Sequence, residues 1–349
     1  MKILYAIQAT GNGHLSRARE IIPHLQQLGE LDLFVSGDNA NVTLPYPVKY
    51  RSKGFSIYYN RTGGLDYLKT FRNTKTQRLI KEVRDFPIEQ YDLVINDFEF
   101  ISAYAARLKH KEIVGFGHQV AFHSTATPRP KRKSYFGELV LKHYAPCHYG
   151  LGLHFDEFDD FIKKPIIRSE VRNLDVKELG HYTVYLGHYE DKEVIKYLKK
   201  VKDAEFHLFS KSAKEIDKYK NIKILPINNE LYLESLAGCE GLITGAGFEA
   251  PAEAMFLGKK VMALPIRGQY EQLCNAKALK EIGITVVKKI NEKFPLKLHN
   301  WIQNVKPLQI AYPDQTEELV SQIFTNKEHL KKLRSNRKRK SIFRWLLST

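Results

Sequence analysis

A histidine follows two glycines near the start of the chain, in the stretch GNGHLSRARE (11–20). Imidazole changes its protonation near neutral pH, so His14 could accept a proton from a substrate as a general base. Gly11 and Gly13 remove side chains from the turn, which lets a ligand or a facing domain approach the backbone closely. The start of a helix also presents unpaired N–H groups that attract anions. We therefore interpret Gly11, Asn12 and Gly13 as a candidate acceptor or diphosphate loop.

The glycine pair by itself also fits an ordinary turn between a strand and a helix. Ser16 stands where the six-position dinucleotide fingerprint has its third glycine, so the stretch does not predict a dinucleotide cofactor. A histidine is an unusual residue for such a tight turn. It is His14 that favours the functional interpretation.

A second group of polar residues follows predicted strand ends in TGAGFEAPAEAMFLGKKVMALPIRGQYEQLCNA (244–276). The turn at 245–247 precedes a helix that carries Glu253, whose carboxylate can accept hydrogen bonds from a ribose diol. Side-chain amides both donate and accept, which suits sugar hydroxyls. Each residue alone also fits a solvated helix surface, but together on neighbouring loops they predict a nucleotide-sugar site. The candidate donor-binding residues here are Gly245, Ala246, Gly247, Phe248, Glu253, Arg267, Glu271, Gln272 and Asn275.

Three further strand ends carry candidates for the same site. Asp97, in NDFEF, could act as a general base or orient a histidine, and it could equally cap the helix that follows; the sequence leaves these roles open. His118 and Gln119, in GFGHQ, are expected to line the acceptor side. The backbone N–H groups of Gly187 and His188, in LGHY, could contact a phosphate.

Two successive blocks of alternating strands and helices must position these residues. The first block predicts strands at 2–9, 31–37, 91–98 and 112–117, with a helix after the first strand that Gly29 ends. The second block begins with a strand at 181–187. This alternation predicts an α/β chain with two Rossmann-like, doubly wound parallel sheets, whose ligands bind beyond the carboxyl ends of the strands. We expect an N-terminal acceptor-side domain (1–165), a C-terminal nucleotide-sugar-binding domain (166–325), a basic tail (326–349), and a hinge within 156–173.

The length and charge of the chain limit its class. Its 349 residues are more than one ordinary hydrophobic core contains, so we expect two domains. Its net charge is +16 and is concentrated in PRPKRK (128–133) and in 327–349, which suits an anionic partner or substrate. No nucleic-acid module is recognisable, so we expect no nucleic-acid partner. The N-terminal MKILYAI lacks the long apolar centre and the small-residue cleavage site of a signal peptide, so we expect none there. No apolar run comes near the roughly 20 residues that span a bilayer. With three cysteines that lack metal spacing, this favours a cytoplasmic location.

The tail joins a basic run to an apolar end. Its basic residues between Lys327 and Arg344 are followed by Trp345 and two leucines. This order fits an anionic membrane surface, such as the inner face of the cytoplasmic membrane, where aromatic rings lie at the headgroup level. The alternative is a helix that packs its apolar end onto the N-terminal domain.

Taken with these motifs, the chain resembles nucleotide-sugar glycosyltransferases of the two-Rossmann-domain (GT-B) type. It is most similar to the family of the peptidoglycan N-acetylglucosaminyltransferase (glycosyltransferase family 28 C-terminal domain) and its relatives of unassigned acceptor. The resemblance covers roughly residues 1–325 and is most specific at GAGFEAPAE…LP…QYEQLCNA. It implies that Glu253 holds the nucleotide ribose, that Gln272 and Asn275 lie by the donor sugar, and that UDP is the nucleotide. The peptidoglycan enzyme of that family has a longer glycine run before its histidine. It also has an apolar membrane patch without an obvious counterpart here. These two differences bear on the identity of the acceptor more than on that of the donor.

These observations predict an inverting glycosyltransferase that moves a sugar from a nucleotide diphosphate-sugar to a lipid-linked or cell-envelope acceptor. His14, or Asp97 in its place, would remove the proton of the acceptor hydroxyl. The sequence contains no Asp-x-Asp pair, so we expect no metal ion and no cofactor, with helix N-termini and Arg267 stabilising the leaving diphosphate. The alternative function is a nucleotide-sugar 2-epimerase of the same architecture, which would need no second substrate.

Overall fold

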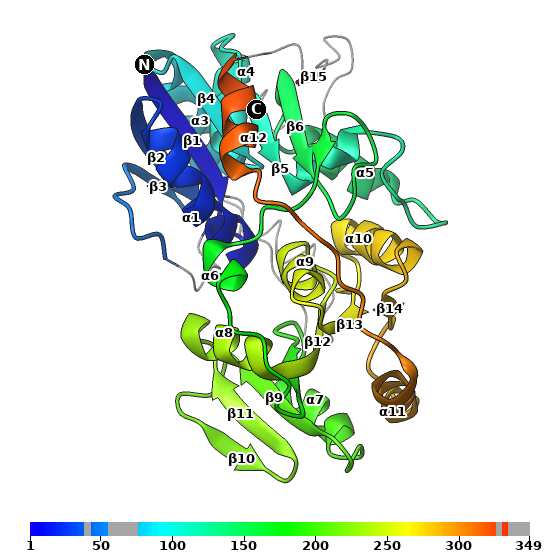
Figure 1. Cartoon of the computed structure of the whole chain (residues 1–349). Helices are drawn as coiled ribbons and strands as arrows, with labels where there is room; N and C mark the ends of the chain where they lie inside the picture. Colours follow the sequence, from blue (N-terminus) through cyan, green and yellow to red (C-terminus); the bar gives the residue numbers. More distant parts are fainter. Residues whose placement is uncertain (38–42, 55–75, 326–329, 334–349) are drawn as a thin grey trace.

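The computed structural model describes residues 1–37, 43–54, 76–325 and 330–333, and it forms two lobes, each built on one sheet (Figure 1). Helices α9 (Glu249–Phe256) and α10 (Tyr270–Glu281) of the second lobe lie at the side that faces the first lobe (Figure 1). Two mostly parallel sheets with helices on their faces confirm the predicted α/β class.

The first sheet has β1 at its centre and the strand order β15-β6-β5-β4-β1-β2-β3, with β7 paired to β6. Its strands are β1 (Lys2–Gln8), β2 (Glu30–Ser36), β3 (Tyr50–Ser52), β4 (Leu93–Asp97), β5 (Val114–Gly117), β6 (Tyr149–Leu153), β7 (Ile162–Lys163) and β15 (Lys331–Lys332). Residues 3–7 of β1 are fully buried, as expected for a strand that helices cover on both faces. All pairs are parallel except β15 with β6.

Helices cover both faces of this sheet. They are α1 (Asn12–Gln26), α3 (Thr76–Asp85), α4 (Phe100–Leu108) and α5 (Tyr135–His143), with 3₁₀ turns η1 (Ile88–Gln90) and η2 (His118–His123). Helix α1 buries Leu15, Ile21 and Leu25, which recur at helical spacing. The expected stop at Gly29 is wrong by a few residues: the helix ends at Gln26, and Leu28 is 39% exposed.

The second sheet has the strand order β10-β11-β9-β8-β12-β13-β14. Its strands are β8 (His181–Tyr185), β9 (Glu205–Ser210), β10 (Asp217–Tyr219), β11 (Ile222–Pro226), β12 (Cys239–Gly245), β13 (Lys260–Leu264) and β14 (Thr285–Val286). Its helices are α7 (Asp191–Leu198), α8 (Asn229–Gly238), α9, α10 and α11 (Phe294–Asn304). The edge strand β10 is antiparallel to β11, and the other pairs are parallel.

The chain passes between the lobes twice. The first passage includes α6 (Ser169–Arg172), and after the second passage α12 (Thr316–Thr325) packs against α1 of the first lobe. The expected range 166–325 for the second domain therefore includes a helix that belongs with the first sheet. The beginning of the expected tail also lies there, because β15 pairs with β6 and the flanking Leu330 and Leu333 are buried. Residues 334–349, with the rest of the basic tail, lie outside the described residues.

None of the helices in the described ranges is both long enough and apolar enough to cross a membrane.

Candidate active site

His14 and Asp97 lie together where the first lobe faces the second. His14 is in the first turn of α1, and Asp97 is the last residue of the neighbouring strand β4. The Nδ1 atom of His14 is 2.9 Å from Oδ1 of Asp97. The sequence left open whether Asp97 orients a histidine or caps a helix, and this contact places it with the histidine.

The cap of the next helix is Glu99. Its carboxylate accepts hydrogen bonds from the backbone N–H groups of Ile101 (2.8 Å) and Ser102 (2.6 Å) at the start of α4. Between the two carboxylates, Phe98 has a left-handed backbone conformation with φ of +56°. Such a conformation is uncommon for a large side chain. This backbone conformation lets the side chains of Asp97 and Glu99 point in different directions.

Arg17 holds Asp97 from the same helix that carries His14. One guanidinium nitrogen donates to both carboxylate oxygens, at 2.9 and 2.7 Å, and the side chain of Arg17 is only 2% exposed. Burial alone would raise the pKa of Asp97, but Arg17 and His14 lower it below its ordinary value. Asp97 is therefore a charged carboxylate near neutral pH. Arg17 follows His14 by three residues, a helical spacing that brings both side chains to one face.

Gly117, at the end of β5, leaves room for the side chains of Asp97 and Arg17. A Cβ at this position would lie 2.5 Å from Oδ1 of Asp97 and 3.1 Å from a guanidinium nitrogen of Arg17. Its φ of +152° is also a value that other residues rarely adopt. The sequence analysis did not single out Gly117, although it lies directly before His118.

The two lobes meet at an aromatic stack beside this cluster. Phe248, before α9, stacks on His118 with ring centroids 4.1 Å apart and an angle of 6°. The Nε2 atom of His118 is 2.8 Å from Oδ1 of Asn275, which in turn donates to the carbonyl of Ala246 at 3.1 Å. His118 was expected on the acceptor side and Asn275 beside the donor sugar. In this structure they are buried against each other.

Gln119 joins the same contact to His14. Its amide nitrogen is 3.5 Å from Nε2 of His14 and donates to Glu271 of α10 at 3.1 Å. The ring nitrogen of His14 that faces away from Asp97 is thus directed toward residues from both lobes. Sequence reasoning assigned Gln119 to the acceptor and Glu271 to the donor, and the structure brings them to one place.

The two predicted glycine turns differ in what they face. A Cβ added to Gly11 or Gly247 would meet no atom within 4 Å, so the backbone at both positions borders open space. A Cβ on Gly13 would instead lie 3.0 Å from Cγ of Glu249, the first residue of α9. Asn12 hydrogen bonds with the hydroxyl of Tyr185 across the gap. The start of α1 therefore meets the second lobe, as close approach at a glycine turn permits.

Comparison with known proteins decides the family of this two-lobed chain. The family described as glycosyl transferase family 1 matches residues 1–306. The chain belongs to glycosyl transferase family 1. No curated protein sequence matches it.

Solved structures similar to this transferase share its fold at low sequence identity. MurG of Acinetobacter baumannii is 16% identical with a TM-score of 0.52, and 92% of this chain and 98% of MurG are covered. UGT89C1 of Arabidopsis thaliana, complexed with UDP, is 13% identical with a TM-score of 0.56 and coverage of 92% and 94%. The glycotransferase of kitacinnamycin is 14% identical with a TM-score of 0.55 and coverage of 92% and 93%. The resemblance to GT-B glycosyltransferases is confirmed, and the epimerase alternative gains no support.

In the second lobe of the transferase, residues that follow three strands lie close together. A Cβ added to Gly245 would lie 3.5 Å from Gln272 and 3.8 Å from His188. Gln272 accepts a hydrogen bond from the backbone N–H of Ile266 at 2.9 Å, which fixes its amide group. Burial lowers the pKa of His188 to about 4, with Lys211 acting in the same direction, so His188 is neutral at pH 7.

Lys211 is a further candidate for contact with the donor phosphates that the sequence did not indicate. It follows β9, and its side chain lies 3.1 Å from the position of a Cβ on Gly187. An exposed lysine beside the predicted phosphate loop adds positive charge there. A single lysine after a strand carries no distinctive pattern, so no sequence signal indicated it.

Glu253 occupies a different environment from the one expected. Both of its carboxylate oxygens accept hydrogen bonds from Arg168, at 2.6 and 3.1 Å, and Glu253 is 4% exposed. Arg168 also donates to Asn229 at 3.0 Å. A ribose diol would have to share this carboxylate with a bidentate arginine. Arg168 lies in the predicted hinge region and was not predicted as its partner.

Arg267 is exposed on the loop between β13 and α10. Gly268 beside it has a left-handed φ of +83°, which sets the course of the loop. The structure thus leaves the side chain of Arg267 at the surface of the second lobe. The described residues contain no group of three or more His, Cys, Asp or Glu side chains arranged to hold a metal ion.

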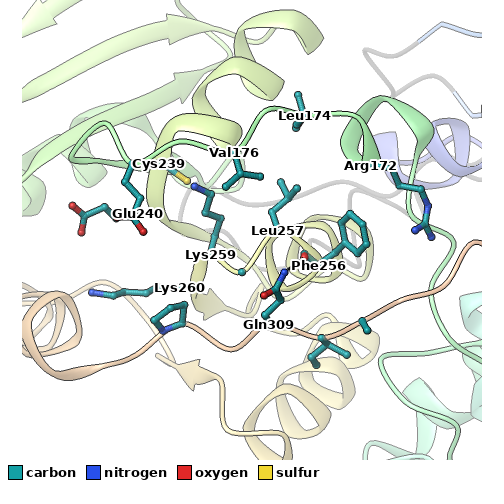
Figure 2. A pocket seen from close by; sticks show the side chains of 15 residues that line it. Arg172, Leu174, Val176, Cys239, Glu240, Phe256, Leu257, Lys259, Lys260 and Gln309 are labelled. Atoms are coloured by element: carbon teal, nitrogen blue, oxygen red, sulfur yellow. Dashed lines mark hydrogen bonds between the residues drawn. The ribbon is translucent and has the colours of Figure 1, made fainter.

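A cavity of about 900 Å³ lies elsewhere, at the amino ends of β12 and β13 (Figure 2). The two passages between the lobes both line it, the first with Arg172, Leu174, Val176 and Glu178, and the second with Pro307, Gln309, Ile310 and Ala311. Its lysines already donate to carbonyl oxygens, Lys259 to Lys177 at 2.7 Å and Lys260 to Ile302 at 2.8 Å. Ligands of such sheets bind at the opposite ends of the strands, so this cavity is not the predicted site.

Proposed function

We propose that this glycosyltransferase is an inverting enzyme that transfers a sugar from a nucleotide diphosphate-sugar to an acceptor hydroxyl. UDP is the nucleotide that we propose for the donor. The observation that carries the proposal is the contact between His14 and Asp97. In the tautomer that donates Nδ1–H to Asp97, the Nε2 atom of His14 can take the acceptor proton. The charged Asp97 then stabilises the imidazolium that forms. The hydroxyl oxygen attacks the anomeric carbon as the bond to the diphosphate breaks.

In this proposal the donor diphosphate lies between the two glycine turns. Gly11 and Gly247 border open space, and each lies at the start of a helix, α1 or α9, whose unpaired N–H groups favour an anion. These N–H groups would stabilise the charge on the leaving diphosphate without a metal ion. The donor is expected to rest mainly on the second lobe, where the loops with Gln272 and His188 converge.

A titration with nucleoside diphosphates tests this placement without any acceptor. Calorimetry with UDP, dTDP, GDP and ADP should show binding of one of them, with UDP tried first. Gly247→Ala is the matched variant, because its added methyl group meets no protein atom but projects into the space assigned to the diphosphate. We expect at least about a tenfold weaker dissociation constant with an unchanged melting temperature. Equal binding by Gly247→Ala would contradict the placement.

For the acceptor we propose a lipid-linked or cell-envelope molecule at an anionic membrane surface. The net charge of +16 and the basic tail support this. The described part of the chain adds a patch before and at the start of α5. Tyr135 and Phe136 are 80% and 49% exposed and follow three exposed cations, residues 131–133. Exposed aromatic rings beside cations suit a headgroup layer.

Co-sedimentation with vesicles tests the membrane contact. The full chain should pellet with anionic vesicles at low salt and stay in solution with neutral ones, because each cation near the surface adds about 1 kcal/mol. Tyr135→Ser with Phe136→Ser should weaken the binding. A full chain that ignores anionic vesicles would contradict this contact and leave the glycosyltransferase assignment unaffected.

A further inference from the structure

The guanidinium of Arg17 lies between carboxylates from both lobes. One terminal nitrogen donates to Asp97 at 2.9 and 2.7 Å, and the other donates to Oε1 of Glu249 in α9. The nitrogen on Asp97 is also 3.3 Å from Nδ1 of His14. The side chains of Arg17, Asp97 and Glu249 are 2%, 0% and 14% exposed. Charges that are buried in this way interact more strongly than charges in water.

The net charge beside His14 depends on whether the second lobe is in place. Within the first lobe, the negative charge of Asp97 and the positive charge of Arg17 cancel. When it is ionised, Glu249 adds one negative charge, so the three groups together carry −1. A net negative charge next to an imidazole favours the imidazolium, the form that His14 takes on when it accepts a proton.

We propose that Glu249 is a positioning residue that makes His14 an effective proton acceptor only while the two lobes are closed. The inference deepens the proposed function and depends on His14 as the base. In the open enzyme, Arg17 neutralises Asp97 and the base is weak. On closure, Glu249 adds a second carboxylate to Arg17, which still donates to Asp97, so two carboxylates share one guanidinium beside His14. Deprotonation of the acceptor is thereby confined to the closed state, in which the donor is also held.

The local structure is built for this contact. Only a glycine at position 13 admits Glu249 without displacement, since an added Cβ would lie 3.0 Å from its Cγ. Glu249 begins α9, where the helix N-terminus favours a negative charge. Burial raises the pKa of Glu249 to about 7, and Arg17 acts against this increase. Because this value already includes the effect of Arg17, Glu249 is about half ionised at pH 7 and carries its full charge above that pH.

Other titratable groups face the same cluster and remain unchanged in the test. Glu271 reaches His14 through Gln119, with the amide of Gln119 3.1 Å from the carboxylate. Tyr5 of β1 interacts with Asp97, Arg17 and Glu249, and its pKa is raised well above its usual value by burial. His118 interacts with Glu271 and Arg17. Because none of these groups is altered in Glu249→Gln, a shift in that variant reports the charge of Glu249.

The test compares Glu249→Gln with the native chain. The amide keeps the shape and a hydrogen-bond acceptor for Arg17 but removes the charge. We expect kcat to fall about three- to tenfold, because a weaker base accepts the proton less readily, while the donor KM changes less than about twofold. The acidic limb of the pH profile of kcat/KM should move to lower pH, because the carboxyl of Glu249 no longer takes part in the titration. Glu281→Gln, the same change at an exposed site on α10, should leave the profile unmoved.

A second readout separates this proposal from the proposed function. The ring signals of His14 can be titrated by NMR in the full chain without substrates. Their midpoint should move to lower pH in Glu249→Gln and, in the same direction, in Gly13→Ala, whose methyl group displaces Glu249. A midpoint unchanged in Glu249→Gln overturns the role of Glu249, whatever the activity. If the midpoint moves but no donor is turned over by the native chain, it is the proposed function that fails.

Discussion

Gly13 and Glu249 touch across the gap between the two lobes, so that a Cβ on Gly13 would lie 3.0 Å from Cγ of Glu249. This relationship explains the second glycine of GNGH: it admits a side chain of the facing lobe, whereas Gly11 borders open space. His14 follows immediately, so the contact between the lobes lies beside the proposed base. The geometry of the proposed base is thereby linked to the contact between the lobes.

Gly117 should be essential for the cluster of His14, Arg17 and Asp97. In Gly117→Ala the methyl group would press on Asp97 from a backbone conformation that alanine disfavours. We expect a loss of about 1–3 kcal/mol in the free energy of unfolding and a fall in kcat that exceeds any change in donor affinity. Urea unfolding and steady-state kinetics measure both. Gly11→Ala, with extended backbone and no neighbour, is the control for stability, and equal stability of the two variants would contradict the expectation.

Glu253→Ala should destabilise the protein, because it leaves the buried Arg168 with Glu170, at 3.2 Å, in place of its bidentate carboxylate partner. Breaking a buried ion pair from one side costs about 3–5 kcal/mol. Glu253→Gln keeps the shape and should remain folded. If Glu253 also holds the ribose, calorimetry on this variant should show UDP binding weakened roughly 30- to 150-fold. Unchanged UDP binding by a folded Glu253→Gln would remove Glu253 from the donor site.

The contact of Asp97 with Arg17 and His14 should make stability depend on pH in the acid range. Because the pKa of Asp97 is lowered in the folded state, its contribution is fully present above the unfolded value of about 3.9 and is lost as the pH falls through the folded value. The free energy of unfolding should therefore fall more steeply below about pH 4 in the native chain than in Asp97→Asn. Parallel curves for the two proteins would show that Asp97 contributes no such linkage.

Donor turnover should not require a divalent cation. With the diphosphate held by helix N-termini, a chelator such as EDTA should change the rate by less than about twofold. The assay is donor turnover with and without EDTA, followed by addition of Mg²⁺. A loss of turnover on chelation that Mg²⁺ restores would contradict the metal-independent mechanism.

Hydrophobic patterning was sufficient to predict the buried parallel strands. β1, β4 and β5 are short, mainly apolar runs, and each lies within a couple of residues of its predicted bounds. The short antiparallel edges β10 and β15 were not predicted, because two or three exposed residues carry no period. The apolar face of α12 indicates that it packs on something, but not that it returns to α1.

The candidate site was predicted in its parts rather than in its contacts. Strand ends identified His14, Asp97 and the glycine turns, since parallel sheets bring these ends to one edge. The pairing of Arg17 with Glu249 joins residues 232 positions apart, and each alone looks like an ordinary charged helix residue. The same limit hid Arg168 as the partner of Glu253. The role of each charged side chain depends on the residue that it pairs with, and these pairs form only in the folded chain.

The most direct test of the central claim is the configuration of the sugar that the enzyme first releases. A UDP-α-sugar hydrolysed slowly in the absence of acceptor can be followed by proton NMR, with water in place of the acceptor hydroxyl. An inverting enzyme that uses His14 as base should release the β anomer first, and His14→Ala should lower this rate by about 10²- to 10⁴-fold while still binding UDP. Initial release of the α anomer, or a His14→Ala variant that turns over at the native rate, would contradict the mechanism proposed for this site.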